Sequence, residues 1–139
     1  MISDVGVHEM LSLDQVVKAF QREFGTLENR FAIHDLTLDV ASEATDADLN
    51  RPGVYVYWKE ALGVIKVGKH QTNARVRSLE HIRDNTRNEH LQMADLAGDP
   101  LCHILLFTVP RNEDIYWLLS LEAFFEWNLQ PAIRAGRVG

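Results

Sequence analysis

The chain has 139 residues, of which 46% are hydrophobic, and a single cysteine, Cys102. This length suits one domain that buries about two-thirds of the surface exposed by its unfolded chain, and one cysteine excludes an internal disulfide framework. No apolar run approaches the roughly 20 residues that cross a bilayer, and the N-terminus lacks the build of a signal peptide. We therefore expect a soluble, cytoplasmic α/β domain with no membrane partner.

The net charge of −6 is unevenly distributed along the chain. Residues 1–50 carry three basic and ten acidic side chains (−7), residues 51–90 carry eight and four (+4), and residues 91–139 carry three and six (−3). Acidic proteins are poor general binders of nucleic acid, which favours basic surfaces. Only the positive middle segment is suited to phosphate binding, although clustered surface charge is more often simply solvated.

The first helix is predicted at residues 13–24. Ser12 and Gln15 have the spacing of a capping box, and apolar residues then recur at helical intervals. Residues 31–36 can form a short edge strand, and the acidic stretch 39–50 is predicted to be a loop or an irregular helical turn.

A β-hairpin is predicted at residues 53–68, where two runs alternate between the two faces of a ribbon around a four-residue turn. With this turn, Tyr57 faces Lys66 and Tyr55 faces Gly68 on one side of the ribbon. We expect that side to be open and to receive a phosphate at the gap left by the glycine. The other side is wholly apolar and can cover a core; it comprises Val54, Val56, Trp58, Ile65 and Val67.

A helix capped by Thr72 or Asn73 is predicted to follow the hairpin and to run to about residue 85. Arg77 and His81 lie about 40° apart on one side of it, so both can reach one anion. The apolar stripe expected on the other side consists of Val76, Leu79 and Ile82.

The remaining elements are a short helix at residues 88–97, a buried strand at 101–109 and a last helix at 113–129, capped by Asn112. Glu122 lies within the apolar stripe of the last helix, where an unpaired carboxylate would be costly. Two explanations stay open at this point. Glu122 either pairs with a buried arginine or ligates a metal ion at the edge of the core.

A set of short motifs follows in order along the chain: Gly53-Val-Tyr55, Lys66-Val-Gly68, Asn73, Arg77, His81, Leu121-Glu122 and Pro131. Through these motifs, residues 52–134 resemble the GIY-YIG nuclease superfamily. The resemblance implies an α/β (α+β) fold with a small mixed or antiparallel three-stranded sheet flanked by helices. Residues 1–50 would add an acidic helical extension, forming one compact unit with the nuclease domain at 51–139.

The resemblance also implies roles for individual residues. Tyr55 would act as the base or orient the base for the attacking water, Arg77 would stabilise the scissile phosphate, and His81 would contact the phosphate or assist proton transfer. Glu122 would hold one divalent ion, Mg²⁺ or Mn²⁺. Arg75 competes with Arg77 for the arginine role because one extra residue precedes the helix. The expected contacts with DNA are Lys66, Lys69, Arg75 and Arg77.

Two residues depart from the family pattern: Lys66 stands where tyrosine is usual, and Arg134 where asparagine is expected. We predict that the Lys66 ammonium lowers the pKa of Tyr55 and so replaces the second tyrosine by charge, as a further catalytic residue. The implied function is metal-dependent DNA hydrolysis by a GIY-YIG-type endonuclease. The alternative is an inactive, nuclease-derived module that binds nucleic acid or protein, and a protein partner or a homodimer would use the N-terminal extension.

Overall fold

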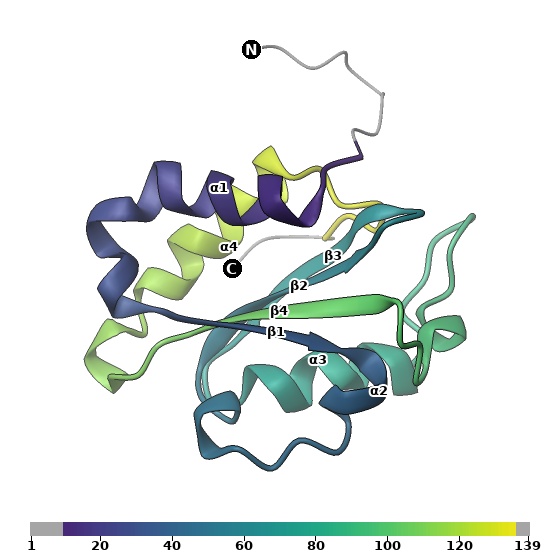
Figure 1. The fold of residues 1–139 in the computed structure, drawn as a ribbon, viewed down its shortest axis with the longest axis horizontal. Coiled ribbons are helices and arrows are strands. Elements are labelled where there is room, and N and C mark those ends of the chain that lie inside the picture. The colour runs from purple at the N-terminus through teal and green to yellow at the C-terminus, as the bar shows by residue number, and fades with distance from the viewer. Residues whose placement is uncertain (1–9, 136–139) are drawn as a thin grey trace.

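The fold is a four-stranded antiparallel sheet between two layers of helices (Figure 1). It was obtained as a computed structural model, which describes residues 10–135; residues 1–9 of the N-terminal extension and residues 136–139 lie outside the described part. The strands follow the order β1-β4-β2-β3 and comprise β1 (Ala32–Thr37), β2 (Gly53–Lys59), β3 (Gly63–His70) and β4 (Cys102–Thr108). The helices are α1 (Leu13–Phe24), α2 (Leu38–Ala41), α3 (Ala74–Arg83) and α4 (Trp117–Asn128).

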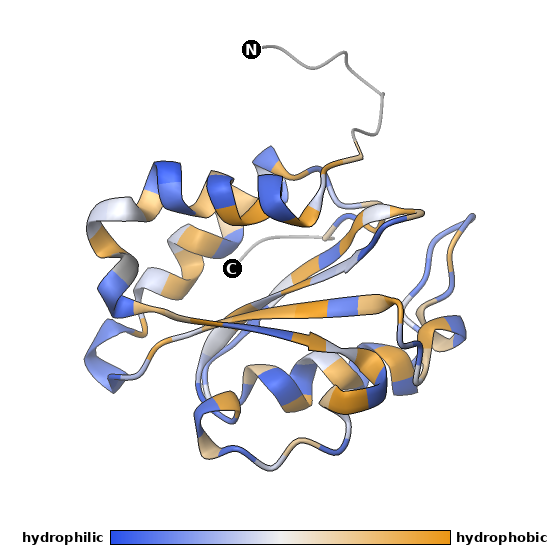
Figure 2. Cartoon of the chain, in the orientation of Figure 1, coloured by the Kyte–Doolittle hydropathy of each residue, from blue (hydrophilic) through white to orange (hydrophobic). Residues whose placement is uncertain are grey.

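The sheet separates two hydrophobic cores. Side chains of α1 and α4 pack on one face, against Val56 and Phe107 of the central strands. Side chains of α2 and α3 pack on the other face, against Tyr57 and Ile104. Colouring by hydropathy shows the reason: β4, at the centre, is apolar along most of its length, whereas α1 alternates between apolar and polar bands (Figure 2). A strand covered on both faces needs such a run, and a helix covered on one side needs a stripe.

The expected α/β class is confirmed, with four strands instead of three. The fourth strand is β1, which confirms the short edge strand expected at residues 31–36. It pairs with β4 in antiparallel register and forms one edge of the sheet. It comes from the first 50 residues, so this segment contributes to the sheet as well as to the helices.

The first helix begins as its sequence predicts. The Ser12 hydroxyl accepts from the Gln15 backbone N–H at 3.1 Å, and the Gln15 side chain accepts from the Ser12 N–H at 2.8 Å. Both bonds of a capping box are therefore present, and α1 covers the predicted residues.

The hairpin register is confirmed for the pairs Tyr57–Lys66 and Tyr55–Gly68. A bulge follows, because Trp58 pairs with Val64 and not with Ile65. The assignment of Ile65 to the face of Val54 and Val56 was therefore wrong: Ile65 packs in the core of the α3 face, and Val64 takes its place on the other. A bulge has this effect because one extra residue shifts the alternation of side chains between the faces.

The predicted apolar stripe of α3 was wrong in part. Val76 is 43% exposed, and the helix buries Ala74, Ser78 and His81 against the sheet. The reason lies in the strand beneath, which presents polar groups: the Tyr57 hydroxyl donates to the carbonyl of Ser78. Leu79 and Ile82 pack at the edge of the same core.

The last third of the chain also differs in detail. The expected helix at 88–97 is reduced to a 3-10 turn, Met93–Leu96, and Asn112 begins a second 3-10 turn before α4 instead of capping α4 itself. The buried strand is confirmed as β4, where burial raises the pKa of the Cys102 thiol to about 12. Among the described residues, no helix has the length and apolar composition needed to cross a membrane.

Candidate active site

Tyr55 lies across the edge strand β3. Its neighbour on that strand is Gly68, and a Cβ atom at position 68 would collide with the Tyr55 hydroxyl and lie 2.8 Å from its ring carbon Cε1. The glycine therefore makes room for the phenol ring. The expectation of an open face with a phosphate gap was wrong, because the ring fills the gap and Tyr55 is only 2% exposed.

His81 is the hydrogen-bond partner of this phenol. Its Nε2 atom lies 2.5 Å from the Tyr55 hydroxyl, and its Nδ1 atom lies 2.6 Å from the hydroxyl of Thr86. Burial, supported by the charges of Arg77 and Lys66, lowers the pKa of His81 to about 4. The imidazole is therefore neutral at pH 7. If the phenol donates to Nε2, Nδ1 carries the proton and donates to Thr86.

Thr86 is a site residue that the sequence did not reveal. It follows Asn85, whose positive φ of 52° turns the chain back at the end of α3. The Thr86 N–H then donates to the His81 carbonyl at 2.9 Å, while its side chain meets the imidazole. A tolerant αL residue such as asparagine just after a helix signals this turn, but only the fold shows which side chain it positions.

Arg77, not Arg75, lies beside Tyr55. The charge of Arg77 acts on the phenol and opposes the rise in its pKa, and its guanidinium donates to Glu80 at 2.9 Å. Arg75 points elsewhere: it donates to the Asn50 side chain and the Ala41 carbonyl, each at 2.9 Å. The expected contact between Arg75 and DNA is therefore unsupported, and Arg77 is the arginine of this cluster.

Burial dominates the chemistry of Tyr55. It raises the pKa of the phenol far above the usual value, and Glu122 and Glu80 add to the rise. The prediction of a lowered Tyr55 pKa was therefore wrong, because burial outweighs the opposing charge of Arg77. Burial lowers the pKa of Lys66 itself, while Glu126 and Glu122 favour its ammonium form, so Lys66 interacts mainly with the carboxylates of α4.

Glu122 and Glu126 lie four residues apart on α4 and are both buried. The charge of Glu122 acts on Tyr55 and on Lys66, so Glu122 lies near both residues. Glu126 accepts from Arg134 Nε at 2.8 Å and from the Ala135 N–H at 3.0 Å. Glu126 therefore forms an ion pair between α4 and an arginine.

The path of the chain after α4 brings Arg134 next to Glu126. The N–H groups of Ala132 and Ile133 donate to the carbonyls of Val64 and Ile65, at 3.0 and 2.8 Å. The chain thus runs along the outer edge of β3, and Ile133 enters the core of the α3 face. This edge contact cannot be read from sequence, because two residues are too few for a strand pattern.

The possible metal ligands of this cluster suit only a Mg²⁺ site in which the protein supplies few of the ligands. No three His, Cys, Asp or Glu side chains come together as metal ligands within residues 10–135. Mg²⁺ nevertheless often uses one or two carboxylates and takes waters and substrate phosphates as its other ligands. Glu122, whose negative charge acts at the Tyr55 phenol, fits that role.

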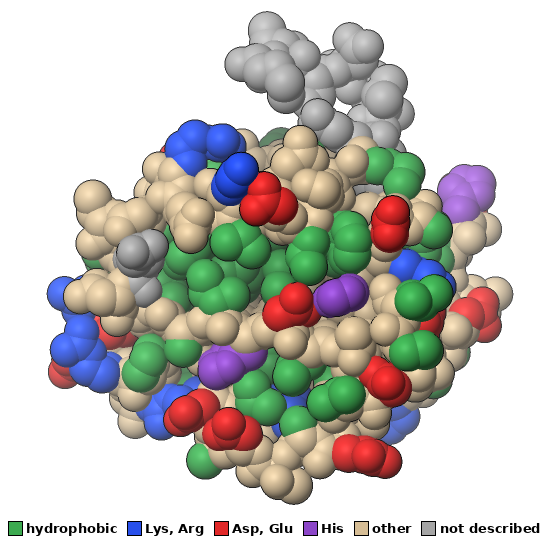
Figure 3. All heavy atoms as spheres, in the orientation of Figure 1, with side chains coloured by type: hydrophobic (Ala, Val, Ile, Leu, Met, Phe, Trp, Pro, Cys, Tyr) green, Lys and Arg blue, Asp and Glu red, His purple; other side chains and the backbone are tan. Residues whose placement is uncertain are grey.

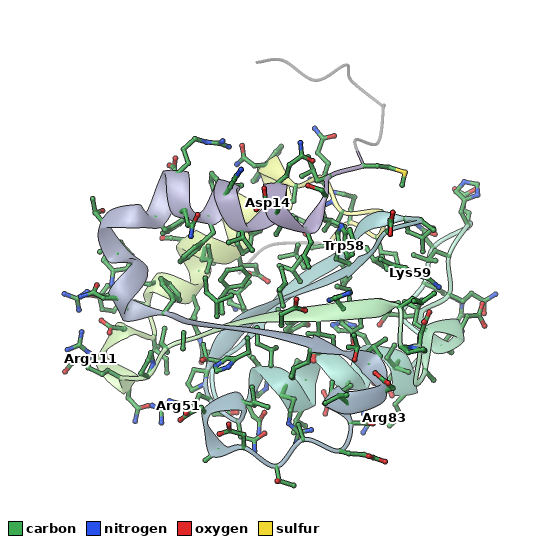
Figure 4. The ribbon with its side chains drawn as sticks, viewed as in Figure 1. Asp14, Arg51, Trp58, Lys59, Arg83 and Arg111 are labelled. Atoms are coloured by element: carbon green, nitrogen blue, oxygen red, sulfur yellow. The ribbon has the colours of Figure 1, made fainter. Side chains whose placement is uncertain are left out.

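The other predicted contacts with DNA do not form one surface. Lys69 pairs with Val54, so it lies on the opposite face of β3 from Lys66. Two basic residues outside the predicted set are also far from each other: Figure 4 shows Arg51 at the far end of the molecule from Lys59, and Lys59 is paired with Asp99 at 2.6 Å. On the face in Figure 3, basic side chains are scattered among acidic ones. Of the four expected basic contacts, only Lys66 and Arg77 belong to the cluster.

A hollow of about 480 Å³ lies at the turn end of the hairpin, away from Tyr55. None of the candidate catalytic residues lines it. Its walls are formed by Trp58, Lys59, Glu60, Ala61, Pro100, Leu101 and His103.

The chain matches no known family of proteins, no curated protein and no solved structure. The likeness to the GIY-YIG nucleases therefore depends on the motif residues alone.

Proposed function

We propose that the chain is a metal-dependent phosphodiesterase that cleaves DNA in the manner of the nucleases it resembles. The observation that supports this most strongly is the 2.5 Å contact between the Tyr55 hydroxyl and His81 Nε2. The charges of Arg77 and Glu122 act on the same phenol. Four residues that the resemblance marks as functional, from β2, α3 and α4, thus converge on one group.

In the proposed reaction, Tyr55 orients a water molecule for attack on the scissile phosphate. The water loses a proton to the phenolic oxygen while the phenolic proton passes to Nε2 of His81. One water O–H bond breaks, the phenolic O–H bond is renewed, and the imidazole becomes an imidazolium. As the water oxygen bonds to phosphorus, the P–O bond to the leaving nucleoside oxygen breaks, and that oxygen takes its proton from solvent. The imidazolium then returns its proton to solvent. A phenol with a strongly raised pKa is a poor base alone, so the neutral His81 is the final proton acceptor.

Arg77 and Glu122 have complementary parts in this proposal. The Arg77 side chain is 39% exposed, more than its neighbours in the cluster, and its planar fork is suited to binding the phosphate and the charge developing on it. Glu122 would hold the metal ion. A bound Mg²⁺ would supply Lewis-acid polarisation of the phosphate oxygens.

A second candidate function is a binding module that keeps the fold without the chemistry. Its supporting observation is burial: Tyr55 is 2% exposed, and Lys66, His81 and Glu122 are each 8% exposed. A substrate phosphate that meets only Arg77 would be bound but not cleaved. The overall negative charge agrees with this candidate.

Cleavage of supercoiled, branched and single-stranded DNA in Mg²⁺ or Mn²⁺ tests the proposal. We expect cleavage by the wild type and its loss in Tyr55→Phe and Glu122→Ala. The control is Glu113→Ala, which removes a carboxylate that is 72% exposed and outside the cluster. Salt-dependent binding without cleavage would favour the module, and cleavage by Glu122→Ala at the wild-type rate would exclude the metal role of that residue.

A further inference from the structure

Helix α4 has its charged and apolar residues in unusual places. Its sequence is WLLSLEAFFEWN, and its only two charged residues, Glu122 and Glu126, are buried against the sheet. The side that faces solvent therefore carries no charge. α1 shows the ordinary arrangement, with exposed residues such as Asp14 and Lys18 forming an ion pair at its surface.

The solvent side of α4 instead carries large apolar groups. Tyr116 is 65% exposed, Leu119 is 49% exposed and Trp127 is 72% exposed. With Ala123 between them they are spaced by three, four and four residues, so at about 100° per residue they fall within an arc of about 80°. We call these four residues the α4 stripe. The solvent side of a surface helix is normally polar, so an apolar stripe on that side is normally covered.

We propose that the α4 stripe is a dimer interface and that its occupant is a second copy of this chain. An uncharged, apolar stripe offers nothing to a nucleic acid, which needs cations, but it is complementary to itself. In a two-fold dimer the same patch serves both partners. This inference concerns assembly and does not depend on the proposed nuclease activity.

The order of side chains along the stripe suits an antiparallel pair of helices. A two-fold axis near its middle sets Leu119 opposite Ala123 of the second copy, a large group against a small one. The same axis sets Tyr116 opposite Trp127 of the second copy, so each end of the contact pairs two aromatic rings. Large-against-small alternation is how helices interdigitate, and aromatic pairs add further stabilisation.

The α4 stripe supplies part of the area of a standard interface. From their exposed fractions, the three large side chains together offer on the order of 400 Å², about half of the roughly 800 Å² that each partner contributes to a standard interface. Exposed Ser120, beside the stripe, and neighbouring elements would have to supply the remainder. Single exposed apolar residues need no explanation, but several in line on one helix do.

Analytical ultracentrifugation of the full chain between about 1 and 100 µM tests the inference. The expected mass of the wild type at high concentration is twice 15.9 kDa. Trp127→Glu and Leu119→Lys should each halve the mass. The matched control is Leu101→Glu, which places a charge at an apolar residue that is 67% exposed but lies in the turn before β4; it should remain dimeric. If Trp127→Glu fails to fold, Leu119→Lys decides.

Fluorescence gives an independent measurement. Dilution should shift the tryptophan emission to longer wavelength as Trp127 becomes exposed, and Trp127→Phe should lack the shift. A wild type that stays monomeric over the whole range overturns the inference, as does a Trp127→Glu variant that stays dimeric. If the wild type is monomeric and Trp127→Glu lowers its melting temperature, a segment of the same chain covers the stripe, and the inference is equally overturned.

Discussion

The burial of His81 predicts a loss of stability in mild acid. Its pKa falls from an ordinary 6.5 to about 4 in the folded protein, chiefly because burial disfavours the charged imidazolium. Below pH 6.5 the unfolded chain binds a proton at this position that the folded chain refuses, so the free energy of unfolding declines as the pH falls. The decline continues until the pH reaches about 4, where the folded form also binds the proton.

The magnitude follows from the size of the shift. The full difference of about 2.5 pKa units corresponds to about 3 kcal/mol, of which about 2 kcal/mol is lost between pH 7 and pH 5. Urea denaturation at several pH values measures it. Other groups also titrate in this range, so the quantity to compare is the difference between the wild type and His81→Gln, which cannot be protonated.

We expect the unfolding free energy of the wild type to fall by about 2 kcal/mol more than that of His81→Gln between pH 7 and pH 5. His90→Gln, which changes an exposed histidine, is the control and should follow the wild type. Parallel curves for the wild type and His81→Gln would refute the burial of a neutral imidazole at this site. They would also remove the neutral base from the proposed reaction.

Two further predictions concern the two tyrosines of β2. Gly68→Ala should lower the free energy of unfolding by about 1–3 kcal/mol, because its methyl group would collide with the buried Tyr55 ring; Gly25→Ala, which has open space around it, should not. Tyr57→Phe should cost about 1 kcal/mol in urea denaturation, because it removes the hydrogen bond to the Ser78 carbonyl, yet leave any cleavage activity unchanged. A loss of cleavage in Tyr57→Phe without a loss of stability would show that the wrong tyrosine was assigned to the reaction.

Local signals in the sequence predicted the elements well. The capping box of Ser12 and Gln15, the cap at Asn73 and the pairing of Tyr57 with Lys66 are all present in the structure. Each of these depends on residues that are near in sequence or joined by one short turn. Their energetics are therefore decided within a few residues.

The wrong predictions concern side chains whose environment depends on elements that are distant in sequence. The helical spacing of apolar residues such as Val76 did not predict which face of α3 packs on the sheet. The side of β2 beneath α3 presents tyrosine hydroxyl groups, which favour polar partners on the helix. The burial of Tyr55 depends on α3 covering that side. The ion pair of Glu126 with Arg134 depends on the chain turning along β3 after α4, which no local pattern announces.

The two departures from the family pattern meet at the carboxylates of α4. Burial lowers the pKa of Lys66, but the charges of Glu126 and Glu122 oppose that shift and favour its ammonium form, and Arg134 forms an ion pair with Glu126. The positive charges of Lys66 and Arg134 thus compensate the negative charges of the two glutamates. Lys66 therefore already supplies beside Glu122 part of the positive charge that a metal ion would bring, and a divalent ion must compete with it.

This competition makes Lys66→Met a direct test of the metal site. Without the ammonium, Glu122 keeps its negative charge and loses a compensating one, so Mg²⁺ or Mn²⁺ should bind roughly tenfold more tightly, equivalent to about 1.4 kcal/mol. Isothermal titration calorimetry with Mn²⁺ measures the change. Lys69→Met, three residues further along β3 and on its opposite face, is the matched control and should bind like the wild type. If Lys66→Met gains no affinity, or if the gain survives in a Lys66→Met and Glu122→Ala double variant, then Glu122 does not hold the ion.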